Sequence, residues 1–86
     1  SATGSYEILI IDLLDVPKVD GSAALALEEV IQQATEQHKT VFIIGLTYHV
    51  ARLMSRMGCL DLVREAQRFD SRPDAVRAAV ALLRDQ

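Results

Sequence analysis

The residues best suited to chemistry lie in the turn Asp20-Gly21-Ser22, between an apolar segment and a long alanine-rich segment. An aspartate beside a hydroxyl at the start of a helix suits a phosphorylation switch, because added negative charge there changes a partner surface. The alternative is a helix cap, since Asp20 and Ser22 can both accept hydrogen bonds from first-turn N–H groups. No partnered base is visible for Ser22, so the sequence does not support a nucleophilic enzyme. We expect a chain that is not an enzyme.

Other catalytic and metal-binding patterns are missing from the sequence. A phosphate loop or dinucleotide fingerprint needs closely spaced glycines, and the four glycines are Gly4, Gly21, Gly45 and Gly58. His38 and His49 lie at the two ends of one predicted strand, so we expect them to be ordinary surface histidines. The single cysteine, Cys59, excludes an intrachain disulfide and a cysteine-cluster zinc site, and a small buried filler is the favoured interpretation. We expect neither a metal nor a cofactor.

Composition limits the class of protein further. The chain has 86 residues, of which 50% are hydrophobic and 24% charged, which is typical of one small globular domain. A net charge of −3 and an aromatic content of 5% argue against a nucleic-acid partner. The second half is rich in arginine, for which a solvated helix surface is the simpler interpretation and an interaction face the alternative. Residues 1–5 are small and polar and are interpreted as a linker or tag remnant, with the domain spanning 6–86.

The elements that must position the turn form a βαβ unit. Tyr6–Leu13 predicts a strand buried on both faces, because its apolar residues Ile8–Ile11 are continuous rather than alternating. A helix then starts at the Asp20/Ser22 turn and ends near His38-Lys39. Its predicted inward residues are Ala23, Leu27, Val30, Ile31 and Ala34. The apolar segment Thr40–Leu46 predicts a second buried strand, parallel to the first.

The second half repeats the strand and helix order. Thr47-Tyr48 leads into a helix over His49–Met57, which is predicted to bury Val50, Leu53, Met54 and Met57, with Gly58 as its C′ residue. A short strand is predicted near Ala66–Phe69. Ser71-Arg72-Pro73-Asp74 has the form of a capping box and opens a last helix. Its predicted inward stripe is Val76, Ala79, Val80 and Leu83, with Arg72, Arg77 and Arg84 facing out. The pattern is a small α/β sandwich in the order βαβαβα.

The run from Ile8 to Ala23 resembles the central motif of STAS domains. The Gly45-Leu46 strand end, the helix end at Arg56-Met57-Gly58 and the closing Phe69-Asp70-Ser71 also fit the family pattern. STAS domains occur as cytoplasmic C-terminal domains of SulP-type anion transporters and as bacterial anti-sigma-factor antagonists. The resemblance implies a STAS-like (anti-sigma-factor-antagonist-like) sandwich, mainly a parallel sheet with helices.

The turn differs between the two branches of the family. In the antagonists the phosphorylated serine directly follows the motif aspartate, whereas here Gly21 holds that position and Ser22 comes one later. The Asp-x-Ser spacing and the preceding Val16-Pro17 are more similar to the transporter branch. The resemblance therefore implies a non-catalytic regulatory or assembly domain of a sulfate or bicarbonate transporter, with Asp20, Gly21 and Ser22 as its regulatory loop and Thr47 in a second loop. A free-standing antagonist regulated by serine phosphorylation is the alternative, and a small-molecule or nucleotide sensor is a third hypothesis.

The resemblance also implies partners and a location. The expected partners are the membrane domain of the same transporter and a cytoplasmic protein, at the cytoplasmic face of the plasma (bacterial inner) membrane. STAS domains usually begin with a strand or hairpin and a helix before the strand seen here at Ile8, so the domain is interpreted as shortened or N-terminally truncated. A missing strand leaves a sheet edge exposed, so we expect a homodimer or a strand borrowed from a partner.

Overall fold

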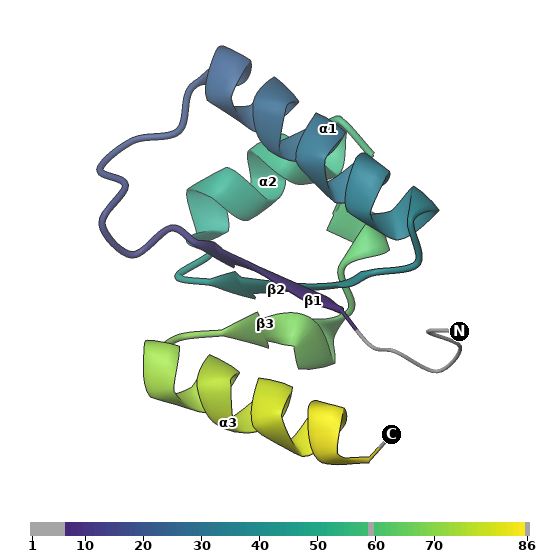
Figure 1. Cartoon of the computed structure of the whole chain (residues 1–86). Helices are drawn as coiled ribbons and strands as arrows, with labels where there is room; N and C mark the ends of the chain where they lie inside the picture. The colour runs from purple at the N-terminus through teal and green to yellow at the C-terminus, as the bar shows by residue number, and fades with distance from the viewer. Residues whose placement is uncertain (1–6, 59, 86) are drawn as a thin grey trace.

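A three-stranded parallel sheet forms the middle layer of the computed structural model, which describes residues 7–58 and 60–85 (Figure 1). The strands lie in the order β1, β2, β3, and their bounds are Ile8–Asp12, Thr40–Ile44 and Arg68–Phe69. Both neighbouring pairs are parallel, and Ile10 of β1 lies opposite Phe42 of β2. The predicted parallel βαβ pairing and the short third strand are both confirmed.

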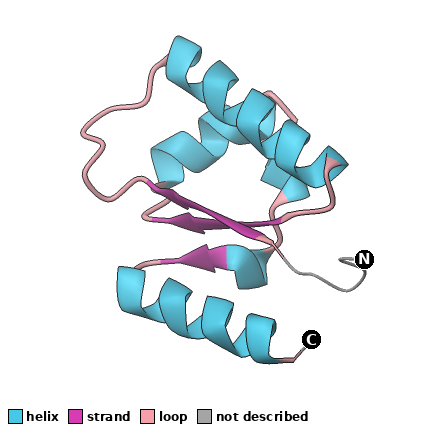
Figure 2. Ribbon diagram, in the orientation of Figure 1, coloured by secondary structure: helices cyan, strands magenta, loops and turns pink. Residues whose placement is uncertain are grey.

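The helices form two layers, one on each side of the sheet (Figure 2). Helices α1 (Gly21–Glu36) and α2 (Tyr48–Arg56) cover one face, and α3 (Arg72–Arg84) covers the other. Two short 3₁₀ turns, η1 (Leu60–Leu62) and η2 (Glu65–Gln67), connect α2 to β3. The fold is therefore the small α/β sandwich that the sequence predicts, in the order βαβαβα.

The two apolar strands are buried to different degrees. Residues Val41–Ile44 of β2 are all buried, as predicted. The prediction that the first strand is buried on both faces is wrong, because Ile10 in the middle of β1 is 38% exposed. Within the described residues β1 has a strand neighbour on one side only, so it is covered less completely than the central strand. Tyr6, the predicted start of this strand, lies outside the described residues.

The main core lies between the sheet and the layer of α1 and α2. Fully buried side chains from α1, α2 and the following connection meet there, namely Ala24, Ile31, Met54 and Val63. The prediction that Val30 points inward is wrong, since it is 43% exposed. The helix is capped at Asp20, and its rotation about its own axis turns Ala24 and Ile31 toward the core. Val30 lies to one side of the buried face, where it lines a hollow with Val16. Ala34 is buried and Leu27 partly buried, as predicted.

The second helix agrees with its prediction to within one residue at each end. Val50 and Met54 are buried, and Leu53 and Met57 pack against the core. Gly58 has a φ of +78°, which is the left-handed conformation expected of a C′ residue. Cys59, predicted to be a buried filler, lies outside the described residues.

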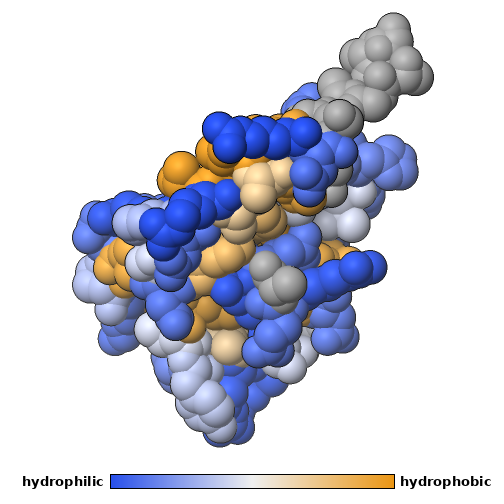
Figure 3. Space-filling view, turned by 90° about the horizontal axis from the view of Figure 1, so that it is seen from below, coloured by the Kyte–Doolittle hydropathy of each residue, from blue (hydrophilic) through white to orange (hydrophobic). Residues whose placement is uncertain are grey.

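The last helix packs on the sheet through a different stripe from the predicted one. Ala79 is buried as predicted, but its buried companion is Ala75, while Val76, Val80 and Leu83 are 39–52% exposed. The rings of Phe42 and Phe69 lie 4.9 Å apart, and Phe42 lines a hollow together with Ala78 of α3. Bulky rings on the sheet favour small residues on the helix, because alanines allow close approach. Figure 3 views this side from below and shows apolar side chains exposed among charged ones.

Candidate functional site

The loops that follow the strands meet at one edge of the sheet. The strands are parallel, so their carboxyl ends lie on the same side, where α/β proteins usually bind ligands. Each strand is followed there by a loop that ends in a capped helix start. The three caps are Asp20, Thr47 and Ser71, whose side-chain oxygens accept hydrogen bonds from backbone N–H groups at 2.9, 3.2 and 3.3 Å. This edge is the candidate functional site.

The predicted regulatory loop supplies the first of these caps. Asp20 Oδ1 accepts from the N–H of Ala23, and Gly21 is the first residue of α1. Ser22 lies inside the first helical turn and is exposed. The prediction that both Asp20 and Ser22 cap the helix is therefore correct for Asp20 and wrong for Ser22, because the cap position precedes Gly21. No atom outside the neighbouring residues lies within 4 Å of a Cβ built on Gly21, so this surface is open.

The second predicted loop is held tightly. Thr47 caps α2, and Gly45, two residues earlier, has a φ of +76°. A Cβ on Gly45 would lie 2.9 Å from Leu14 Cδ2 and 3.1 Å from the Leu14 backbone nitrogen. The N–H of Gly45 donates to the carbonyl of Phe69 at 2.8 Å. The turn after β2 therefore fits closely against the loop after β1 and against β3.

A hollow of about 260 Å³ is lined by residues of both loops. Its polar lining comes from Lys18 of the first loop and from Thr47 and His49 of the second. The apolar lining consists of Leu13, Val16, Pro17, Val19, Gly45 and Val50. The structure thus brings the two predicted loops to one place, but the residues before Asp20, rather than Asp20-Gly21-Ser22, line the hollow.

An ion-pair cluster ties α3 to the first loop. The guanidinium of Arg72 donates from Nε to Asp12 and from Nη2 to Asp15, the latter at 2.8 Å. Asp12 also accepts the N–H of Leu14 at 2.9 Å. The hydrogen bond from Arg72, supported by that from Leu14, lowers the pKa of Asp12 below its ordinary range. The same two carboxylates raise the pKa of Arg72.

The described residues contain no group of three His, Cys, Asp or Glu side chains placed to hold a metal ion. The two histidines lie on different elements. His38 follows the end of α1 and has a φ of +61°, and His49 lies in the first turn of α2. None of the helices in the described part of the chain is both long and apolar enough to span a bilayer.

Comparison with known proteins identifies the family. The model of the STAS domain matches residues 1–75 of the chain. The chain belongs to the STAS domain family. It is 35% identical over 75 residues to the bicarbonate transporter BicA of Synechocystis sp. (strain ATCC 27184 / PCC 6803 / Kazusa), an alignment covering 87% of this chain and 13% of that protein. It is 29% identical over 80 residues to BicA of Picosynechococcus sp. (strain ATCC 27264 / PCC 7002 / PR-6), covering 93% of this chain and 14% of that protein.

The match to the STAS family includes all three caps at the candidate site. It extends through β1, α1, β2, α2 and β3 and reaches Ala75 in the first turns of α3. The chain spans about 13–14% of the length of the two transporters that it matches. The family resemblance inferred from the Ile8–Ala23 motif is thereby confirmed.

The ion-pair cluster of this STAS domain was missed by the sequence analysis. Asp12 ends β1 and Asp15 lies in the loop after it, and Arg72 was interpreted as an outward-facing helix residue. A signal for the pairing exists. Asp12 and Asp15 lie at the carboxyl end of β1, and Arg72 begins the helix that follows β3, so parallel strands place all three at the same edge of the sheet. That signal becomes usable only once α3 is known to cross beneath β1.

Proposed function

We propose that this STAS domain is the non-catalytic regulatory or assembly domain of a SulP-type inorganic anion transporter of the bicarbonate or sulfate class. The observation that carries the proposal is how much of each protein the two alignments cover. Both relatives are named bicarbonate transporters, and each matches nearly all of this chain with only 13–14% of its own length. The domain would lie on the cytoplasmic face of the plasma (bacterial inner) membrane. The membrane domain of the same protein would carry the transport site.

Within this domain we assign recognition to the loop that contains Asp20, Gly21 and Ser22, together with the adjacent turn at Thr47. Asp20, Ser22 and Thr47 have polar side chains, and these three residues and Gly21 are all exposed. The space over Gly21 is open, and the neighbouring hollow presents Lys18 and His49. A partner segment or an anionic group could approach here without displacing packed side chains.

The transporter assignment is tested with the complete gene. The encoded protein is expressed in cells, and uptake of labelled bicarbonate and labelled sulfate is measured in parallel, with and without residues 7–85. We expect the complete protein to take up one of the two anions and the deletion to change that uptake while the remaining protein still reaches the membrane. A complete gene without membrane-spanning helices would contradict the proposal and favour the free-standing antagonist.

We also propose that the domain forms a homodimer through the outer edge of β1. Glu7 O accepts from Thr40 N at 3.0 Å, and Leu13 N donates to Ile44 O at 2.9 Å. In a parallel pair alternate residues bond to the same neighbour, so Ile8, Ile10 and Asp12 direct their N–H and C=O groups to the outer edge. An apolar edge strand of this kind is a template for pairing with a second copy.

Sedimentation at high micromolar concentration tests the dimer. We expect the wild-type chain to sediment as a dimer and Ile10→Pro to sediment as a monomer, because proline removes an outward N–H and leaves the bonds to β2 in place. Arg84→Gln, on α3, is the matched control and should remain a dimer. A stable wild-type monomer would contradict the dimer without affecting the transporter assignment.

A further inference from the structure

Helix α2 presents a positively charged face. Its nine residues include His49, Arg52 and Arg56 and no acidic residue. The neighbouring helix α1 has the opposite character, with three glutamates and no Lys or Arg in sixteen residues. We call His49, Arg52 and Arg56, together with Lys18 of the first loop, the α2 basic face. All four side chains are exposed.

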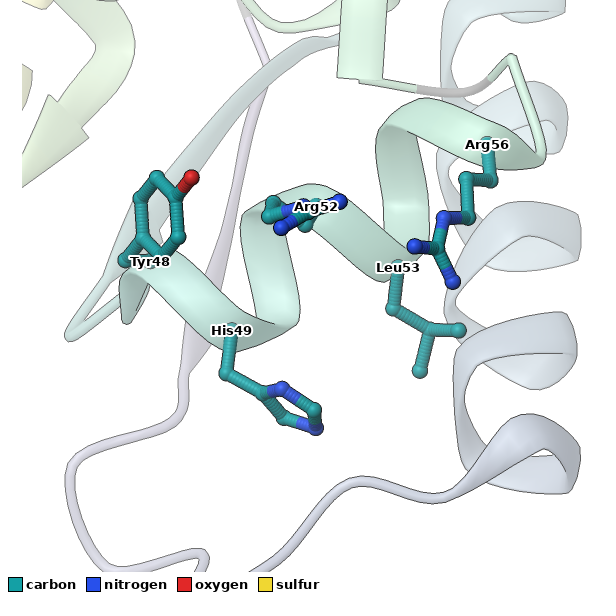
Figure 4. Close-up of a pocket in the computed structure, with 5 residues that line it drawn as sticks. All are labelled: Tyr48, His49, Arg52, Leu53 and Arg56. Carbon is teal, nitrogen blue, oxygen red and sulfur yellow. The ribbon is translucent and has the colours of Figure 1, made fainter.

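The members of this face form one continuous surface. Three of them line a hollow of about 170 Å³ with Tyr48 and Leu53, and Figure 4 shows His49, Leu53 and Arg56 directed toward the same side of the helix. His49 also borders the larger hollow that contains Lys18. The Arg52 guanidinium lies 5.9 Å from the centre of the Tyr48 ring, which is a cation–π distance. The basic face is therefore an extension of the candidate site.

The positive charge of this face is not neutralised by neighbouring carboxylates. The ion pairs among the described residues involve Lys39, Arg72 and Arg77, and none includes Lys18, Arg52 or Arg56. Arg68 is also occupied, since it donates to the carbonyl of Val63 at 2.8 Å. The cations of α2 therefore remain available to an external anion, unlike the arginines that hold the fold together.

We propose that the α2 basic face binds the phosphate headgroups of anionic phospholipids and so sets the orientation of the domain on the membrane. The inference rests on the proposed function, which places the domain beside a bilayer. Clustered Lys and Arg near an anionic leaflet are attracted to it. Tyr48, 78% exposed at the end of the cluster, has the amphipathic ring that suits the headgroup level.

The net charge of −3 does not oppose this contact. Charges are screened beyond about 10 Å at roughly 0.1 M salt. The domain measures 39 × 26 × 18 Å, so charges at opposite ends of its long axis are separated by more than that distance. The glutamates of α1 do lie nearby, and they favour an orientation in which α2 meets the bilayer and α1 tilts away from it.

Vesicle flotation of the 86-residue chain tests the proposal. Vesicles of phosphatidylcholine alone are compared with an equal mixture of phosphatidylcholine and phosphatidylglycerol, at low and at high salt. We expect about a hundredfold stronger binding to the anionic vesicles, lost at high salt, because Lys18, Arg52 and Arg56 each contribute about fivefold. Each arginine near the surface contributes about fivefold, so Arg52→Gln/Arg56→Gln should weaken binding about 25-fold. Arg77→Gln/Arg84→Gln, with the same change in net charge on α3, should leave it nearly unchanged. Circular dichroism confirms that each variant is folded.

Three results would overturn the proposal. The first is equal binding of the wild-type chain to both kinds of vesicle. The second is an equal loss of binding in the two double variants, which would mean that net charge alone decides. The third is binding of polyglutamate, sensitive to Arg52→Gln/Arg56→Gln, without binding to anionic vesicles, which would assign the face to an acidic protein segment. Each of these leaves the transporter assignment intact, because anion uptake is measured separately.

Discussion

The two loops that border the candidate site are held in different ways. The turn after β2 is short and is fixed by backbone contacts, with Gly45 in a left-handed conformation against Leu14 and bonded to Phe69. The loop after β1 runs from Leu13 to Asp20. Leu13 and Val19 anchor it in the core, and the exposed residues between and after them are held by polar contacts, namely the Arg72 ion pairs and the Asp20 cap. Exposed contacts are easily exchanged for those of a partner, whereas close packing is not. The first loop is thus suited to recognition and the second to support.

The largest effect is expected at the supporting turn. Gly45→Ala should destabilise the domain by about 2–3 kcal/mol, because alanine is strained at positive φ and its Cβ would meet Leu14. Chemical denaturation measures the change. The matched control is Gly21→Ala in the recognition loop, which meets no atom within 4 Å and should stabilise the domain by about 0.5 kcal/mol. Equal changes in the free energy of unfolding for the two substitutions would contradict the proposed difference between the supporting turn and the recognition loop.

A smaller effect is expected at the cap of α1. Asp20→Ala should cost about 1 kcal/mol, because the N–H of Ala23 loses its acceptor. Ser22→Ala should leave the free energy of unfolding nearly unchanged, since Ser22 lies within the helix and Asp20 supplies the cap. The melting temperatures of the two variants compare them directly. A larger loss for Ser22→Ala than for Asp20→Ala would show that the cap has been assigned to the wrong residue.

The smallest effect concerns the ion pair that holds the first loop to α3. Arg72→Gln should raise the pKa of Asp12 toward its ordinary range, which an NMR titration of the carboxyl carbon measures. A carboxyl whose folded pKa is lowered stabilises the fold above its unfolded pKa of about 3.9, and this contribution disappears as the pH falls through the folded pKa. Acid unfolding of the variant should therefore depend less steeply on pH below about pH 4. Arg84→Gln serves as the control, and an unchanged Asp12 titration in Arg72→Gln would exclude the pairing.

Sequence reasoning succeeded where the signals are local. The order of elements, the parallel pairing, the Asp20 cap and the C′ role of Gly58 follow from residues that act on their own segment. The two segments predicted as loops lie at the ends of loops in the structure, because each lies between an apolar strand and a helix start. The family assignment followed from the motif that spans the first of these loops.

The wrong predictions concern residues whose burial or pairing depends on an element far away in the sequence. Helix α3 has two adjacent apolar stripes. The rings of Phe42 and Phe69 on the sheet favour burial of the stripe that contains Ala75 and Ala79 over the one that contains Val76 and Val80. The exposure of Ile10 follows from the edge position of β1, which its apolar sequence does not reveal. The Arg72 cluster joins residues 57 and 60 positions apart. Such pairings depend on the crossing of α3 beneath the sheet.

The central claim is that the loop ending in Asp20-Gly21-Ser22 is a recognition loop in a transporter domain. The most direct test is uptake, by the complete protein carrying Ser22→Glu, of whichever of bicarbonate and sulfate the unaltered protein takes up, with Arg84→Gln as a control that changes the net charge equally from the α3 side. We predict a several-fold change in uptake for Ser22→Glu, with a melting temperature within about 2 °C of the wild type, and no change in uptake for the control. Unchanged uptake in Ser22→Glu, with the protein folded and in the membrane, would contradict the claim.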